Sequence, residues 1–116
     1  MQRQVQIKIV AEMPEASEKI PFGVLQAFPP SLLEHIELYY WPKLKRPTDR
    51  QGNYGSLHIK AIVSDQTTVL ISSANLTQYA LALNMELGLI AHQPPLAVQI
   101  TKTINVLIDA KILIAL

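Results

Sequence analysis

The chain has 116 residues, of which 49% are hydrophobic and 16% are charged, and its net charge is +1. This length and composition predict one small globular domain, residues 1–116, and exclude an intrinsically disordered chain. The chain contains no cysteine, which excludes disulfides and thiolate metal sites. A net charge so close to zero gives no argument by itself for a nucleic-acid or acidic partner, so any such argument has to be local.

Neither end of the sequence resembles a targeting or membrane-spanning segment. The N-terminal stretch MQRQVQIKIVAE is interrupted by Lys8 and Glu12 and has no apolar run of signal-peptide length. The C-terminal tract INVLIDAKILIAL is broken by Asp109 and Lys111 and is too short to cross a bilayer. We therefore expect a cytoplasmic protein.

The first half of the chain is predicted to hold two strands and a short helix. In QVQIKIV, residues 4–10, apolar and polar residues alternate, as in a strand with one buried face. Residues 13–30 are rich in proline, and a short helix capped by Ser31 and a strand at IELYYW, residues 36–41, follow them. Because the chain enters its first strand almost at once, we expect either an edge strand or the C-terminal part of a larger module.

The second half of the chain is predicted to alternate strands and helices. Two strands, residues 56–64 and 67–73, are joined by a turn at Asp65-Gln66. The later elements are a helix over 75–83, a strand over 85–92, and a helix from Pro94-Pro95 to about Asp109. The mixture predicts an α/β fold with a mixed β-sheet flanked by helices.

Polar residues interrupt the apolar hairpin GSLHIKAIVSDQTTVLISSAN at regular positions. His58 and Lys60 share one face of the first strand, ~7 Å apart along it, and an anion between them would satisfy both charges. Ser73 and Asn75 end the second strand and can donate to anionic oxygens, and Asn75 opens a helix with free N–H groups. Taken singly, a strand histidine is more often an ordinary core or surface residue, and Ser-Ala-Asn a plain cap. Together they predict a pocket for a tetrahedral anion with a nucleophile at its centre.

The spacing of these residues resembles the signature of the phospholipase D superfamily, which is H-x-K, four residues, D, six residues, and G-S-x-N. Here the pattern is His58-Ile59-Lys60, four residues to Asp65, and six residues to Ser72-Ser73-Ala74-Asn75. Ser72 stands where the family commonly has glycine. The stretch SSANLTQYALALNMELGLI is also similar to phospholipase D-like proteins linked to bacterial DISARM antiphage systems, and to small single-motif bacterial endonucleases.

The resemblance implies a metal-independent phosphodiesterase with no cofactor and the fold of one phospholipase D-like half. In that superfamily one motif histidine attacks phosphorus, and a second protonates the leaving oxygen and then activates water. His58 would be the nucleophile, and Lys60, Ser73 and Asn75 would hold the nonbridging oxygens. Glu86, eleven positions after Asn75, would hydrogen-bond and orient His58.

Two further points concern the rest of the motif. Asp65 is its third letter, but its place at the turn and its parity predict a structural role rather than contact with phosphate. The motif occurs once, whereas the mechanism needs two histidines, and His35 and His92 have no H-x-K context. The resemblance therefore implies a homodimer that shares one active site across a two-fold axis.

A basic segment upstream of the motif suggests nucleic acid as the substrate. The stretch YYWPKLKRPTDR has a local charge of +3, because Asp49 offsets one of its four basic residues. The basic residues, predicted to bind substrate, are Lys43, Lys45, Arg46 and Arg50. Basic side chains beside aromatic ones suit a nucleic-acid backbone and its bases, and the alternative is a solvated loop after an aromatic strand.

Two alternative functions stay open. A phospholipase or phosphatidyl transferase would need an apolar entry surface, which IPFGVLQAFPP, residues 20–30, could form, although this stretch better fits a loop packed on the core. The chain could instead be an inactive phospholipase D-like fragment that binds an anion or nucleic acid without turnover. The reason for this third interpretation is length, since superfamily modules usually carry more strands and helices before the first strand found here.

Overall fold

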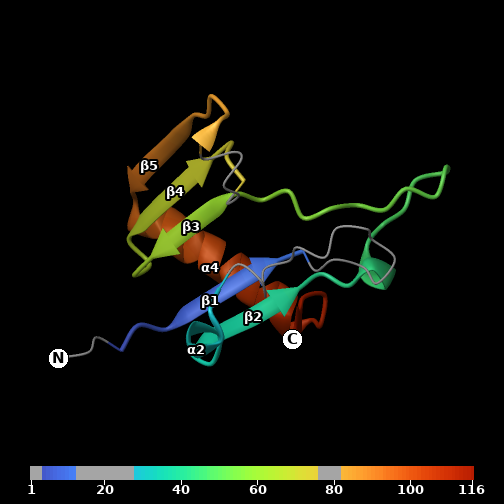
Figure 1. Cartoon of the computed structure of the whole chain (residues 1–116), viewed down its shortest axis with the longest axis horizontal. Helices are drawn as coiled ribbons and strands as arrows, with labels where there is room; N and C mark the ends of the chain where they lie inside the picture. The colour runs from blue at the N-terminus through green and yellow to red at the C-terminus, as the bar shows by residue number, and fades with distance from the viewer. Residues whose placement is uncertain (1–3, 13–27, 76–81) are drawn as a thin grey trace. The chain divides into compact units, whose positions relative to one another are not determined.

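The computed structural model describes residues 4–12, 28–75 and 82–116 of the chain. It divides into two compact units, one of Met1–Leu57 with Leu107–Leu116 and the other of His58–Val106. Each unit has a three-stranded β-sheet of its own, and the helix α4 (Pro94–Asp109) continues from the second unit into the first. The predicted α/β class is therefore confirmed, with one mixed and one antiparallel sheet (Figure 1).

The first unit is built around a mixed sheet. Strand β1 (Ile7–Ala11) runs parallel to β2 (Ile36–Tyr40), and β2 pairs antiparallel with β6 (Ile114–Ala115). Figure 1 shows β1 and β2 side by side, in blue and teal. Leu113, immediately before β6, is buried at 3% exposure. The two-residue strand β6 was not predicted, because it lies within an apolar tract that carries no strand period of its own.

The short helix α2 (Pro30–Leu33) begins earlier than the sequence suggested. Its N-cap is Pro29, with no side-chain capping hydrogen bond, so the prediction of Ser31 as the cap is wrong. The physical reason is Pro30, whose fixed φ suits the first helical position and whose missing N–H is not needed there. Ser31 consequently lies inside the helix rather than at its start.

The second unit carries the hairpin that holds the motif. Strand β3 (Ala61–Ser64) pairs antiparallel with β4 (Thr68–Ser72), and β4 pairs antiparallel with β5 (Gly88–His92). Val69 in the central strand is fully buried, and so is Ala97 of α4. The predicted strand over 56–64 is shorter than expected, because its pairing with β4 ends where the Ser72 N–H donates to the Lys60 carbonyl at 3.0 Å.

The turn between β3 and β4 lies where it was predicted. The Thr67 N–H donates to the Ser64 carbonyl at 3.0 Å, and Asp65 and Gln66 between them have φ of 51° and 54°. Positive φ at both central residues is the pattern of a type I′ turn, whose twist matches that of the flanking strands. This turn fixes the register of the hairpin and so decides which residues of β3 and β4 lie opposite each other.

The helix α4 begins at Pro94 and ends at Asp109, in agreement with the sequence. Most of the helix predicted over 75–83 and most of the stretch over 20–30 lie outside the described residues. No helix in the described ranges has both the length and the apolar character required to cross a membrane.

Candidate active site

The first two motif residues, His58 and Lys60, lie close together in the segment that immediately precedes β3 in the chain. Lys60 Nζ lies 3.3 Å from His58 Nδ1 and 3.4 Å from His58 Nε2, and it also reaches the His58 carbonyl at 3.3 Å. His58 is exposed and Lys60 is half-buried, so the pair is open to solvent. A ring nitrogen that accepts from an ammonium carries a lone pair, and a lone pair is what a nucleophilic imidazole needs.

Ser73 and Glu86 form a second polar pair, between the ends of β4 and β5. The Ser73 hydroxyl donates to Glu86 Oε2 at 2.5 Å and accepts from the Leu87 N–H at 3.1 Å. Glu86 Oε1 also accepts from Asn84 Nδ2 at 3.2 Å. In the described structure Glu86 is thus bonded to a serine and an asparagine, whereas the sequence predicted that it would orient His58.

Strand register explains why these two pairs are separate. Lys60 lies opposite Ser72 on the β3–β4 ladder, whereas Ser73 is the next residue and pairs with Leu87 through its main-chain N–H at 3.0 Å. Because neighbouring strand residues point to opposite faces, Ser73 turns away from the face that carries Lys60. Asn84 was missed in the sequence, although its position two residues before Glu86 would place both on one side of an extended segment.

The remaining motif residues occupy two different places. Asn75 is exposed just after β4, at the edge of the described range, on the same end of the sheet as Ser73. Asp65 is exposed in the turn at the opposite end of β3 from Lys60. This position keeps Asp65 away from His58 along the strand.

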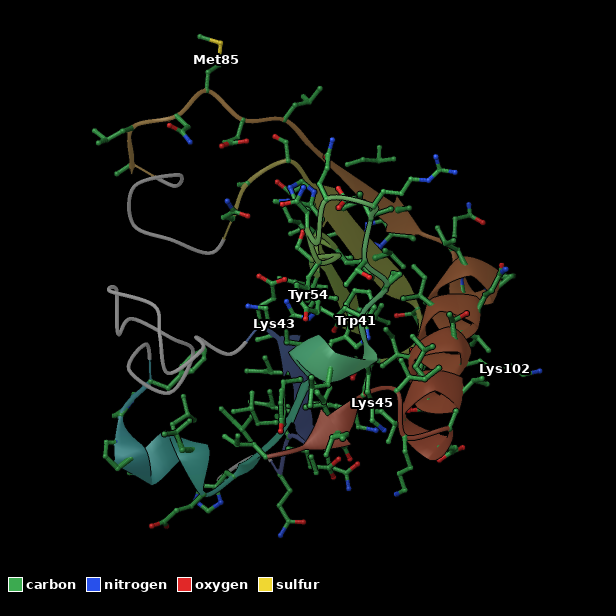
Figure 2. The ribbon with its side chains drawn as sticks, turned by 90° about the vertical axis from the view of Figure 1, so that its right-hand side faces the viewer. Trp41, Lys43, Lys45, Tyr54, Met85 and Lys102 are labelled. Carbon is green, nitrogen blue, oxygen red and sulfur yellow. The ribbon has the colours of Figure 1, made fainter. Side chains whose placement is uncertain are left out.

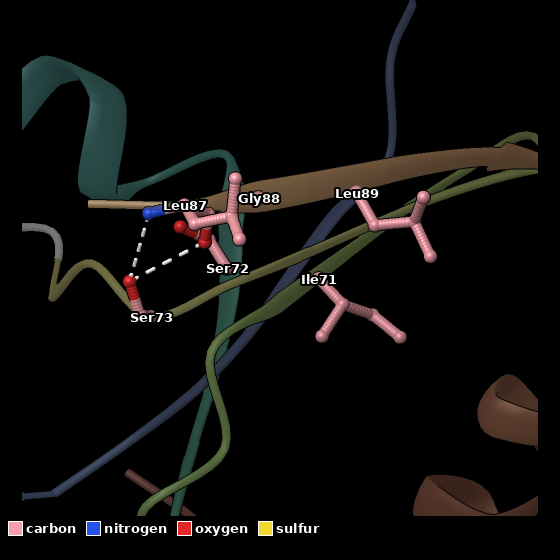
Figure 3. A pocket seen from close by; sticks show the side chains of 6 residues that line it. All are labelled: Ile71, Ser72, Ser73, Leu87, Gly88 and Leu89. Atoms are coloured by element: carbon pink, nitrogen blue, oxygen red, sulfur yellow. Dashed lines mark hydrogen bonds between the residues drawn. The ribbon is translucent and has the colours of Figure 1, made fainter.

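An open apolar pocket of about 590 Å³ lies beside Ser73. Ile71 and Leu89 project from adjacent strands on one side, and Ser73 with its two bonds to Leu87 closes the other end (Figure 3). Leu87 and Leu89 are 83% and 65% exposed, so the pocket is an accessible apolar surface. Gly88 helps to form it, since a Cβ there would stand 3.3 Å from the Ile71 carbonyl oxygen.

The other histidine of this unit lies at the far end of the sheet. His92 Nδ1 is 3.1 Å from Thr68 Oγ1, and the two residues are paired across β4 and β5. Thr68 begins β4 and Ser72 ends it, and Ser72 is the residue opposite Lys60. Within this unit, therefore, the second histidine does not approach His58.

The basic segment belongs to the first unit, and one of its two arginines, Arg46, is hydrogen-bonded to main-chain carbonyls of the chain itself. Arg46 donates to the Trp41 carbonyl from Nε at 3.0 Å and from Nη2 at 2.8 Å, and to the Gly55 carbonyl from Nη1 at 3.4 Å. Its guanidinium also lies over the Trp41 ring, 5.7 Å from the centroid, and 3.6 Å from Glu12. The side chain is only 10% exposed, so its donors serve the chain itself.

The other three basic residues of the segment differ in whether contacts within the chain occupy their charged groups. Lys45 Nζ donates to the Lys111 carbonyl. Lys43 Nζ lies over the Tyr54 ring, 5.0 Å from its centroid, and Arg50 is exposed in the turn that follows Asp49. Lys43 and Arg50 are the basic side chains of this segment that the structure leaves best placed for a ligand.

His58 and Lys60, in the segment that leads into the β3–β4 hairpin, define a candidate site for phosphoryl chemistry. Residues 1–108 match the family model described as "Cardiolipin synthase, PLD-like domain". The chain therefore belongs to this phospholipase D-like family, and with it to a superfamily that acts on phosphodiesters. Searches of curated proteins and of solved structures found no match. Among the described residues, no group of three or more His, Asp or Glu side chains is arranged to hold a metal ion.

Proposed function

We propose that the protein is a phosphodiesterase that works through a phosphohistidine on His58. The observation that carries this proposal is the Lys60 ammonium within 3.4 Å of both imidazole nitrogens of an exposed histidine, in a chain of the phospholipase D-like family. A ring nitrogen of His58 attacks phosphorus and the bond to the leaving oxygen breaks, while a second histidine gives that oxygen its proton. The second histidine then takes a proton from water, whose oxygen attacks phosphorus and breaks the P–N bond.

Lys60 has an electrostatic role in this scheme. The negative charge of the phosphodiester repels nucleophiles, and an ammonium placed beside the attacking nitrogen offsets that charge as the transition state forms. Asn75 would supply a second donor. Ser73 donates to Glu86 and turns away from the face that carries Lys60, so it takes no part in holding phosphate in this scheme, and we assign Glu86 to holding the Ser73 hydroxyl in place.

The second histidine comes from another copy of the chain in our proposal. The chain has three histidines, and His92 lies at the opposite end of its sheet from Lys60. A two-fold axis that passes between two His58 side chains would bring them into one shared active site, where one copy supplies the nucleophile and the other supplies the proton donor. The expected consequence is a homodimer whose activity falls on dilution below its dissociation constant.

We infer that the substrate is nucleic acid. Support comes from the half-buried Lys43 and the exposed Arg50, two cations that can neutralise backbone phosphates. The resemblance of residues 72–90 to DISARM-linked proteins supports antiphage defence as the biological setting. A second candidate function is hydrolysis or transfer at a phospholipid, which is favoured by the apolar pocket beside Ser73 and by the family's description.

The experiment that tests the proposal compares substrates and variants. The purified chain is incubated, with chelator present, with single-stranded DNA, double-stranded DNA and phosphatidylglycerol vesicles, and the release of nucleotides or glycerol is measured. We expect nucleotide release that His58→Ala and Lys60→Ala each reduce by orders of magnitude. His92→Ala is the matched control and should retain activity. Glycerol release alone would favour the second candidate, and full activity of His58→Ala would refute the mechanism.

A further inference from the structure

The hairpin over residues 48–54 presents an exposed aromatic ring beside a cation. Tyr54 is 44% exposed, and Lys43 Nζ lies 5.0 Å from its ring centroid. Two of the aromatic residues in the basic segment YYWPKLKRPTDR make contacts within the chain itself. Trp41 is covered by Arg46, and Tyr39 donates to Glu37 at 3.3 Å with Lys8 over its ring. Lys43 also lies over the Tyr54 ring, but Tyr54 is 44% exposed whereas Trp41 and Tyr39 are half-buried, so Tyr54 is the best placed of these three rings to contact a ligand.

Hydrogen bonds within the turn fix the conformation of this hairpin in the absence of a ligand. Asp49 accepts from the Gln51 N–H, the Asn53 N–H and Asn53 Nδ2, each at 2.9 Å. These bonds, with the Asn53 side chain contributing most, lower the pKa of Asp49 from its usual value. Gly52 takes φ of 83° in the turn, and an isolated bridge pairs Thr48 with Tyr54. A preformed turn reduces the entropy lost when a ligand binds.

We propose that Lys43, Arg50 and Tyr54, the hairpin surface, bind single-stranded nucleic acid. An unpaired base would stack on the Tyr54 ring, and the two cations would neutralise the flanking phosphates. Single strands are favoured over duplex because a paired base cannot offer its face to a tyrosine. The inference rests on the proposed function, since it names the form of nucleic acid that the phosphodiesterase receives. Figure 2 shows Lys43 and Tyr54 together beside the short helix η1 (Lys43–Lys45).

An anionic membrane is the competing ligand for the same surface. Leu44 is 93% exposed and lies between Lys43 and Lys45 in the chain. Its side chain could insert into a bilayer while the lysines contact anionic headgroups. Lys45, however, is tied to the Lys111 carbonyl, and a single exposed leucine gives little apolar area. The pairing of a cation with an aromatic ring on a rigid turn favours the nucleic acid.

The test measures binding in a chain that cannot turn over. In the His58→Ala background, fluorescence anisotropy of a labelled DNA oligonucleotide gives the dissociation constant at several salt concentrations. We expect Tyr54→Ala to weaken single-strand binding about tenfold and Tyr54→Phe to retain it, since stacking needs the ring and not the hydroxyl. Lys43→Gln with Arg50→Gln should reduce the slope of log K against log salt by about 1.4, the value for two phosphate contacts. Lys102→Gln, which removes a cation from α4 (Figure 2), is the matched control.

Each outcome supports or overturns the inference. Equal binding by Tyr54→Ala and the parent chain would overturn it, provided that both melt at the same temperature. Binding to phosphatidylglycerol vesicles without binding to the oligonucleotide would assign the surface to lipid and overturn it as well. If the hairpin surface binds as expected but the wild-type chain cleaves no nucleic acid, the proposed function fails and the binding surface stands.

Discussion

Replacement of Arg46 by alanine should destabilise the first unit strongly, although the residue is a surface cation by sequence. Arg46 gives two charged hydrogen bonds to the Trp41 carbonyl and one to the Gly55 carbonyl, and it lies over the Trp41 ring. Hydrogen bonds from charged donors contribute ~1.5–3 kcal/mol each, and the two to Trp41 share one acceptor, so they do not add fully. The cation–π contact adds ~0.5–1 kcal/mol. The Glu12 ion pair, with a carboxylate that is 42% exposed, adds little.

We therefore expect a loss of about 3 kcal/mol for Arg46→Ala, or a decrease of about 10 °C in Tm for a chain of this size. The chain has a single tryptophan, so Trp41 fluorescence follows unfolding and senses the removed guanidinium directly. Arg46→Lys should recover only part of the loss, because an ammonium cannot make the forked contact or stack as well. Arg50→Ala is the control and should change stability by less than about 0.5 kcal/mol. An Arg46→Ala melt that superposes on the wild-type curve would refute this assignment.

Three further predictions concern the hairpins and the site. Gln66→Gly should raise stability by about 1 kcal/mol, because Gln66 has φ of 54° and glycine adopts that region without strain; a urea melt checks it, and no gain would contradict the turn geometry. The lowered pKa of Asp49 means that its stabilising contribution is complete above the unfolded pKa of ~3.9 and is lost as pH falls below it. The protection factor of the Asn53 amide, which is the factor by which its exchange is slowed relative to an unstructured peptide at the same pH, should therefore fall on acidification below about pH 4, and Asp49→Asn should remove that dependence. Glu86→Gln should reduce turnover less than His58→Ala, and equal losses would give Glu86 a larger role than holding Ser73.

Local patterns in the sequence were sufficient for several elements of the fold. Proline at the first turn and the apolar spacing that follows placed α4 at Pro94–Asp109. The alternation on either side of Asp65-Gln66 placed the β3–β4 hairpin and its turn. Each of these signals depends on residues a few positions apart. Strand β6, by contrast, exists only because Ala115 and Ile114 meet Tyr39 and Tyr40, which are distant in the chain.

The site shows the same division between local and distant information. The proximity of His58 and Lys60 follows from strand parity, which the sequence displays. The partner of Glu86 depends instead on the register of β4 against β5, which sets Ser73 beside Leu87. The use of Arg46 by Trp41 and Gly55 depends on the path of the intervening loop. A count of charged residues could not predict these hydrogen bonds, because it does not distinguish an arginine whose donors are bonded within the chain from one that is exposed.

The most direct test of the central claim is to trap the covalent intermediate. The wild-type chain is mixed briefly with a phosphodiester that carries a radioactive label at phosphorus, quenched in base, and the labelled peptide is identified. We predict a phosphoamide on His58 that is stable to base and labile to acid, and that is absent from Lys60→Ala at short times because attack is slow without the ammonium. Turnover of the same substrate with no label on His58, or with label on another side chain, would contradict the account.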